Sequence, residues 1–235
     1  NLETGQRERL LPDFRMAHYS VSLDGNRVVF VRQNDAGHSP VWLATLDGSS
    51  APRRLASMNA VMSFFGAGGD VFFVGWEGGT TFLYRIKEDG SGLQKVVSDS
   101  VKVLYDVSPD GKWLAAWVGR SVVVYPAGGG APTLICSACA MRAPPDQPAL
   151  VTWSRDGKFV YLHETGLRQT YAVSLRPGQV LPPLPASGIL SPAAAAAWPG
   201  AKLIPQPRAF GGANPAVYAF ARVTTHRNIY RIPVP

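Results

Sequence analysis

Apolar residues in this chain gather into short runs, each bounded by glycine, proline, asparagine or aspartate. Some runs are continuous, as in Val28-Val-Phe-Val31, and others alternate with polar residues, as in Thr81-Phe-Leu-Tyr-Arg-Ile86. Short runs rich in β-branched and aromatic residues predict β-strands. Asp-Gly pairs such as Asp47-Gly48 and Asp89-Gly90 separate several runs, and glycine there supplies the positive φ of a tight hairpin turn. The pattern predicts an all-β fold of many short antiparallel strands.

One phrase repeats along the chain and sets its period. Ser-x-Asp-Gly, followed after two residues by an apolar strand, begins at Ser22, Ser108 and Ser154, and weaker copies occupy residues 66–70 and 211–215. Aligned positions in the strands that follow successive copies lie 43, 43, 46 and 57 residues apart, at Val28, Val71, Leu114, Val160 and Val217. A period in the low forties is typical of a four-stranded propeller blade.

We therefore predict one β-propeller domain over residues 1–235, with five or six four-stranded antiparallel blades. The N-terminal residues read as an outer strand without its first three partners, and the C-terminal unit stops after its third strand at 228–232. Pairing them would close the ring and satisfy exposed strand edges. The alternative is a remnant of a sixth blade. The predicted boundaries are 1–14 for the closing strand and 15–57, 58–100, 101–137, 149–187 and 188–235 for the blades.

The repeated Asp-Gly pairs have a structural interpretation. An aspartate before glycine accepts hydrogen bonds from nearby backbone N–H groups and fixes the turn. Metal binding or acid catalysis is disfavoured, because copies in separate blades lie too far apart to form one site. The predicted structural turn residues are Asp24, Gly25, Asp110, Gly111, Asp156 and Gly157.

Two of these phrases carry a family resemblance. Ser108-Pro-Asp-Gly-Lys-Trp-Leu-Ala and Ser154-Arg-Asp-Gly-Lys-Phe-Val-Tyr resemble bacterial propeller repeats of the TolB type, which are related to the N-terminal propellers of dipeptidyl peptidase IV-like proteins. The ending His226-Arg-Asn-Ile-Tyr-Arg-Ile-Pro233 resembles C-terminal propellers of bacterial serine/threonine kinases and regulators. The resemblance implies a binding, scaffold or sensor domain of a larger bacterial protein, with a protein, peptide or cell-envelope ligand.

Charge and hydropathy narrow the set of partners. The net charge is +7, but the basic residues are dispersed, so we expect an ordinary solvated surface and no nucleic-acid partner. No run of 18 apolar residues occurs, so no membrane span is expected in this chain. We expect a monomer. An extracytoplasmic or periplasmic location is favoured, because related propellers often work outside the cytoplasm.

The sequence offers no catalytic apparatus. It contains no Gly-x-Ser-x-Gly elbow and no kinase motif, and its four histidines lack metal-binding spacings. No catalytic, cofactor-binding or metal-binding residue is therefore assigned. Cys136 and Cys139 form the one Cys-x-x-Cys pair, which we interpret as a local disulfide or as two free thiols, rather than half of a zinc site or a redox centre.

Ligand contacts are expected at a mouth of the central channel, where the innermost strands end. The predicted contact residues are Arg15, His18, Tyr105 and Trp153. The first functional hypothesis is non-catalytic binding. The alternative is a substrate-gating propeller of a hydrolase or peptidase whose catalytic domain is absent, and a weaker third is a lyase or glycosidase. The module encoded next to this chain would discriminate between them.

Overall fold

The computed structural model describes residues 11, 13–34, 37–137, 151–164, 169–182, 197–206, 209–211, 216 and 218–219. Every regular element in this part of the chain is a β-strand, and neighbouring strands in each sheet pair antiparallel. The predicted all-β class is confirmed. Within the described residues no helix could span a bilayer.

The strands form four successive four-stranded units, which we call the first to fourth blades, and a short two-stranded sheet. The first blade contains β1 (Met16–Val21), β2 (Arg27–Arg32), β3 (Val41–Thr45) and β4 (Arg53–Ala56). The second contains β5 (Ala60–Phe65), β6 (Asp70–Glu77), β7 (Thr80–Lys87) and the first half of β8 (Gln94–Val107). The third contains the second half of β8, β9 (Trp113–Val118), β10 (Ser121–Pro126) and β11 (Thr133–Cys136). The fourth contains β12 (Val151–Trp153), β13 (Phe159–Glu164), β14 (Gln169–Ser174) and β15 (Ala201–Ile204). The short sheet pairs β16 (Phe210–Gly211) with β17 (Tyr218–Ala219).

Strand β8 belongs to two blades. Its first half pairs with β7, as in Arg85 with Gln94, and its second half pairs with β9, as in Val107 with Leu114. The second and third blades are therefore joined into one seven-stranded sheet, in the order β11-β10-β9-β8-β7-β6-β5. The boundary predicted between residues 100 and 101 falls inside this continuous strand.

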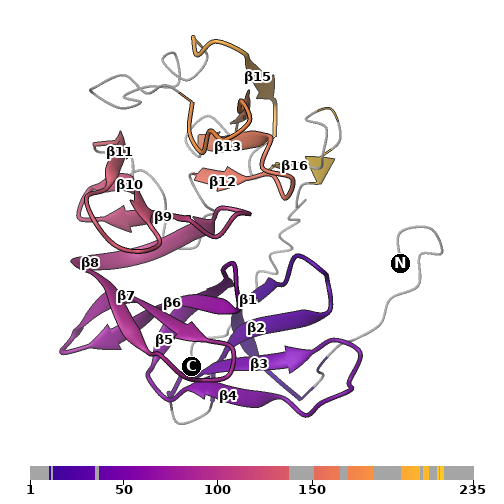
Figure 1. The fold of residues 1–235 in the computed structure, drawn as a ribbon, viewed down its shortest axis with the longest axis vertical. Helices are drawn as coiled ribbons and strands as arrows, with labels where there is room; N and C mark the ends of the chain where they lie inside the picture. The colour runs from indigo at the N-terminus through magenta and orange to yellow at the C-terminus, as the bar shows by residue number, and fades with distance from the viewer. Residues whose placement is uncertain are drawn as a thin grey trace, which may run out of the picture.

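The core lies between blades, not within them. Middle strands such as β2, β6 and β9 are buried on both faces, which explains why their sequences are continuous apolar runs and do not alternate. Val29 and Leu43 of the first blade pack with Phe73 of the second. Further layers join the second blade to the third and the third to the fourth. Figure 1 shows these sheets following one another from the indigo first blade to the orange fourth.

The first strands of the blades lie side by side near the centre. β1 contacts β5, β5 contacts β8, and β8 contacts β12. Side chains of one inner strand accept backbone N–H groups of the next. His18 Nδ1 accepts from Ser63 N at 3.3 Å, Met62 Sδ from Leu104 N at 3.0 Å, and Asp106 Oδ2 from Trp153 N at 2.9 Å. These hydrogen bonds satisfy backbone N–H groups on the open edge of the innermost strand, where no other strand pairs with it.

The fourth blade differs from its predicted boundaries. Its outer strand is β15, which pairs with β14, as in Tyr171 with Leu203, yet residues 201–204 were assigned to the last blade, 188–235. A Pro- and Ala-rich insertion separates β14 from β15 in the sequence. A boundary placed at 187 from the repeat length therefore falls before the outer strand of this blade. Most of the predicted closing strand, and the strand predicted at 228–232, lie outside the described residues.

Candidate functional site

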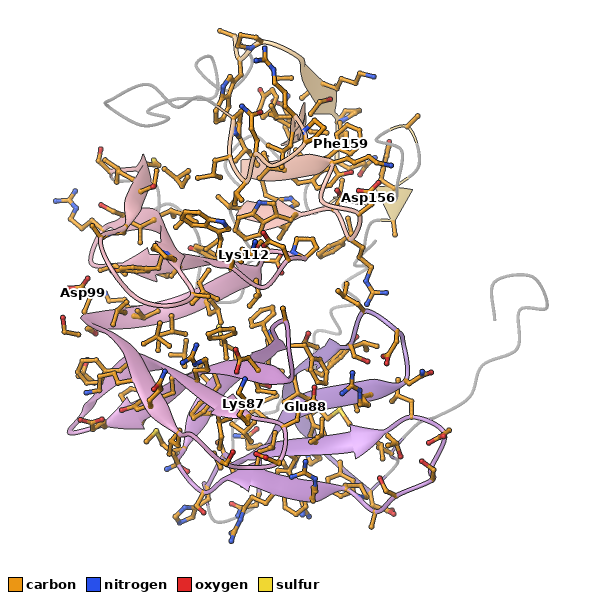
Figure 2. All side chains as sticks on the ribbon, in the orientation of Figure 1. Lys87, Glu88, Asp99, Lys112, Asp156 and Phe159 are labelled. Carbon is orange, nitrogen blue, oxygen red and sulfur yellow. The ribbon has the colours of Figure 1, made fainter. Side chains whose placement is uncertain are left out.

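The three Ser-x-Asp-Gly phrases fold into the same turn. In each copy the serine hydroxyl donates to the aspartate Oδ1, at 2.6 Å for Ser108 and 2.7 Å for Ser154. The serine Oγ then accepts the N–H at the start of the next strand, at 3.0 Å from Arg27 and Trp113 and 2.9 Å from Phe159. Figure 2 shows Asp156 and Phe159 in the third copy. The hydrogen bond from the serine lowers the pKa of the Asp24 and Asp156 carboxyls.

The aspartates are occupied within their own turns. Asp24, Asp110 and Asp156 each accept a second hydrogen bond at 3.1 Å from the N–H two residues later. The glycines after them have φ of +76°, +68° and +69°. Within the Ser-x-Asp-Gly phrase, the serine and aspartate side chains hydrogen-bond inside the turn and glycine has no side chain. The side chain of the residue between serine and aspartate takes no part in these hydrogen bonds.

These intervening residues meet at a cavity of about 710 Å³. Leu23, Pro109 and Arg155 hold that position in the first, third and fourth blades, and all three line the cavity. The second blade contributes its glycine-rich turn, including Ala67. All four inner strands therefore end at one hollow, which is the arrangement expected of a channel mouth. Its volume lies in the usual range of ligand-binding pockets.

Three charged side chains on the cavity wall, Arg27, Asp24 and Glu88, pair with one another. Arg27 contacts the carboxylates of both Glu88 and Asp24, the latter at 3.5 Å. Its guanidinium also lies over the ring of Phe65, 5.6 Å from the centroid. Glu88, labelled in Figure 2, follows β7, so the network joins the first and second blades. Arg27 thus has two acids as partners.

Arg155 is placed differently. Its Nη2 donates to the backbone carbonyl oxygens of Ser22, at 3.1 Å, and Val21, at 3.4 Å. These contacts reach from the turn after β12 to the end of β1, between the fourth and first blades. No ion pair to Arg155 occurs among the described residues. Arg155 also lines a second hollow of about 380 Å³, between the turns of the third and fourth blades.

Asp106 is a further ionisable group on this wall, and its carboxyl accepts two backbone hydrogen bonds. Its Oδ1 accepts its neighbour Val107 N at 2.8 Å, and its Oδ2 accepts Trp153 N. Burial raises the pKa of the Asp106 carboxyl to about 7, although the two N–H groups act in the opposite direction. Near neutral pH the negative charge on this wall is therefore reduced.

The structure separates the four predicted contact residues. Trp153 lines the cavity, and its indole Nε1 donates to Val180 O at 2.8 Å. Tyr105 is buried between the third and fourth blades, and His18 lies against Phe64 with ring centroids 4.8 Å apart. Arg15 precedes β1, at the strand end opposite the cavity. Whether any of them contacts a ligand stays a prediction.

Sequence reasoning missed Tyr19, Leu23, Asp106 and Arg155 as cavity residues. A signal for two of them was present, because Leu23 and Arg155 hold the variable position of the repeated phrase. Asp106 gave no such signal, because its neighbours read as an ordinary strand.

The cysteine pair is described only in part. Cys136 is buried at the end of β11 and is disulfide-bonded. Cys139 lies outside the described residues, so the predicted pairing stays a prediction. In the described part of the chain no group of three His, Cys, Asp or Glu side chains could hold a metal ion.

The successive four-stranded blades, with cores between them and inner strands ending at one hollow, define a β-propeller domain. By sequence the chain matches no protein-family model and no curated protein. Two of the solved structures to which the chain is similar are TolB proteins, and the fold is TolB-like, as the sequence motifs predicted.

TolB from Acinetobacter baumannii superposes with a TM-score of 0.54 and 17% identity over 68% of this chain and 41% of its own. The TolB of Agrobacterium tumefaciens gives 0.52 and 16%, over 68% of this chain and 58% of its own. Hydrazine synthase of Kuenenia stuttgartiensis gives 0.54 and 16%, over 74% and 33%. This chain therefore spans well under two thirds of each neighbour, and the likeness shows the fold alone.

Proposed function

We propose that this chain is a non-catalytic binding domain of a larger bacterial protein, and that it recognises a protein or peptide through the channel mouth. The observation that carries the proposal is the convergence of all four inner strands on the 710 Å³ cavity. A scaffold, sensor or envelope-ligand role would use the same surface.

The shape and lining of the cavity support binding more than chemistry. Asp24 and Glu88 are paired with Arg27, and Asp106 holds two backbone N–H groups. These acids already have structural partners. By contrast, Tyr19 and Leu23 leave 63% and 61% of their surface exposed at this cavity. Exposed apolar side chains beside a hollow favour an interaction site.

Selection from a phage-displayed library of twelve-residue peptides on the purified chain tests the proposal. The double variant Tyr19→Ala/Leu23→Ala should lose binding of the selected peptides. The matched control Trp76→Ala/Leu93→Ala removes apolar side chains of similar exposure elsewhere and should retain it. Failure to select any peptide, or equal loss in both double variants, would contradict channel-mouth binding.

The absence of catalysis is tested separately. The chain should turn over none of a panel of chromogenic glycosides and peptide amides. Turnover that disappears in an Asp106→Ala variant would overturn the non-catalytic proposal, because that acid lines the cavity and its pKa lies near 7.

We also propose that the ring closes through pairing of residues 1–14 with the last blade. Leu11 and Phe14 support it, because they pack against the apolar cluster that contains Phe30, which is separate from the layer between the first and second blades. Hydrogen exchange of the amides at 228–232 should slow in the full chain and become fast when residues 1–10 are deleted. Equal exchange rates in both chains would contradict closure.

A further inference from the structure

We propose that Arg155 is a carboxylate receptor at the channel mouth, and that the ligand is a peptide with an acidic group beside an apolar residue. The inference rests on the proposed peptide-binding function and specifies the chemistry of its ligand. It follows from how the charged groups of one cavity are partnered.

The first observation concerns the two arginines of the cavity. Arg27 has two carboxylate partners, Asp24 and Glu88, and needs no other. Among the described residues, the hydrogen-bond partners of Arg155 are the carbonyl oxygens of Val21 and Ser22, which carry no full charge. A guanidinium forms stronger, often bidentate hydrogen bonds with a carboxylate than with neutral acceptors. An incoming carboxylate can therefore displace the weaker of these contacts.

The second observation concerns the acids that could compete. Asp106 is the remaining carboxyl of the 710 Å³ cavity, and both of its oxygens accept backbone N–H groups. Moving it toward Arg155 would leave the N–H groups of Trp153 and Val107 without their acceptor. Asp110 and Asp156 line the second hollow with Arg155, but each is hydrogen-bonded within its own turn and neither forms an ion pair with Arg155. The positive charge of Arg155 is thus left available to a ligand.

The third observation sets the neighbouring contact. Six large apolar side chains are strongly exposed among the described residues, and two of them, Tyr19 and Leu23, line this cavity. Leu23 also follows Ser22, whose carbonyl oxygen Arg155 contacts. A carboxylate on Arg155 would therefore place the adjoining ligand residue near an apolar rim, where burial of an apolar side chain is favourable.

The peptides selected on the wild-type chain provide the test. Each is resynthesised with Asp and Glu replaced by Asn and Gln, and separately with an amidated C-terminus, and affinities are measured by fluorescence anisotropy. One of the two changes should weaken binding at least about tenfold, and it identifies a side-chain or a terminal carboxylate as the source. Affinity should also fall with added salt, because the attraction is between charges.

The residue is tested with Arg155→Gln, which keeps a polar side chain and removes the charge. The ratio of acid to amide affinity should fall to near one in this variant. Arg54→Gln, at an exposed position on β4, is the matched control and should keep the ratio of the wild type. Unchanged melting temperatures show that both variants fold.

Two results would overturn the inference. One is selected peptides that bind equally as acids and amides, which would leave the channel-mouth function standing without Arg155 as its receptor. The other is an acid preference that survives in Arg155→Gln. If no peptide is selected at all, the proposed function itself fails, and the inference fails with it.

Discussion

At the scale of single residues, the three copies of one turn form an internal comparison. In each copy the glycine after the aspartate has a left-handed backbone conformation; these glycines are Gly25, Gly111 and Gly157. A Cβ on Gly25 or Gly157 would meet nothing within 4 Å, whereas a Cβ on Gly111 would lie 2.3 Å from the backbone nitrogen of Ala67. The second copy, in the third blade, is therefore also a point of contact with the second blade.

Substitution of these glycines should separate backbone strain from crowding. Gly25→Ala should lower the free energy of unfolding by about 1–2 kcal/mol, the cost of a left-handed non-glycine residue. Gly111→Ala should lose about 1–3 kcal/mol more, because the Cβ overlaps the backbone of the neighbouring blade. Urea denaturation measures both. Equal losses would show that the contact with Ala67 relaxes without cost.

A second residue-scale feature is the buried His163. Its Nε2 lies 3.0 Å from Thr152 Oγ1 and its Nδ1 lies 3.2 Å from Thr170 Oγ1. The hydroxyl of Thr170 donates its one hydrogen to Gln206 O, so Thr170 Oγ1 accepts a hydrogen bond from Nδ1–H of His163. Both nitrogens of the neutral ring therefore have hydrogen-bond partners. Burial lowers the pKa of His163 to about 4.

This lowered pKa predicts a pH-dependent stability. The unfolded chain binds a proton near pH 6.5 and the folded chain only near pH 4, so stability falls as the pH drops through that window. Relative to His163→Gln, the wild type should lose up to about 1.4 kcal/mol per pH unit between pH 6.5 and 4. Denaturation at a series of pH values measures the difference. A difference that does not change with pH would contradict the assignment.

At the scale of elements, inner strands are joined by side-chain acceptors of three kinds. An imidazole, a thioether and a carboxylate each receive a backbone N–H of the following blade. Asp106 accepts two backbone N–H groups, those of Val107 and Trp153, whereas the imidazole and the thioether each accept one. Asp106 should therefore matter most for holding the third and fourth blades together.

Removal of this acceptor should cost stability. Asp106→Ala leaves the N–H groups of Trp153 and Val107 without partners, and should lower the free energy of unfolding by at least about 2 kcal/mol. Asp106→Asn keeps one acceptor oxygen and should lose less. Asp47→Ala, in an exposed turn, is the control and should change stability by less than about 1 kcal/mol. Thermal or urea unfolding ranks the three, and the reverse order would contradict the role.

The sequence predicts the second strand of a blade wherever the Ser-x-Asp-Gly turn precedes it, as for β2, β9 and β13. Two bulges limited the prediction of the site. Register shifts between Met16 and His18, and between Leu104 and Asp106, interrupt the regular alternation of these inner strands. Simple alternation cannot locate such shifts. His18 and Tyr105 were expected at the channel from their place on the inner strands; His18 lies against Phe64 and Tyr105 lies between the third and fourth blades, and a ligand contact of either stays a prediction.

At the scale of the whole molecule, stability depends on contacts between neighbours. The layer between the third and fourth blades contains Tyr105, Val122 and Val124 on one side and Val160 and Val173 on the other. Neither blade buries these side chains alone, so the stability of each blade depends on its interface with the next blade.

A chain ended after Ser137 should expose the third blade's half of this layer. We expect the truncated chain to bind the dye ANS and to associate, because a large apolar face would meet water. ANS fluorescence and analytical ultracentrifugation measure both effects. A monomeric truncated chain with an unchanged melting temperature would contradict a core shared between blades.

The continuous strand β8 has a consequence for dividing the chain into fragments. Residues 57–59 lie between strands β4 and β5, so a break there severs no ladder. A break near Ser100 would cut the one strand that joins the ladder with β7 to the ladder with β9, and so would separate the two halves of the seven-stranded sheet. Split-protein reassembly and circular permutation are therefore favoured at the first junction and opposed at the second.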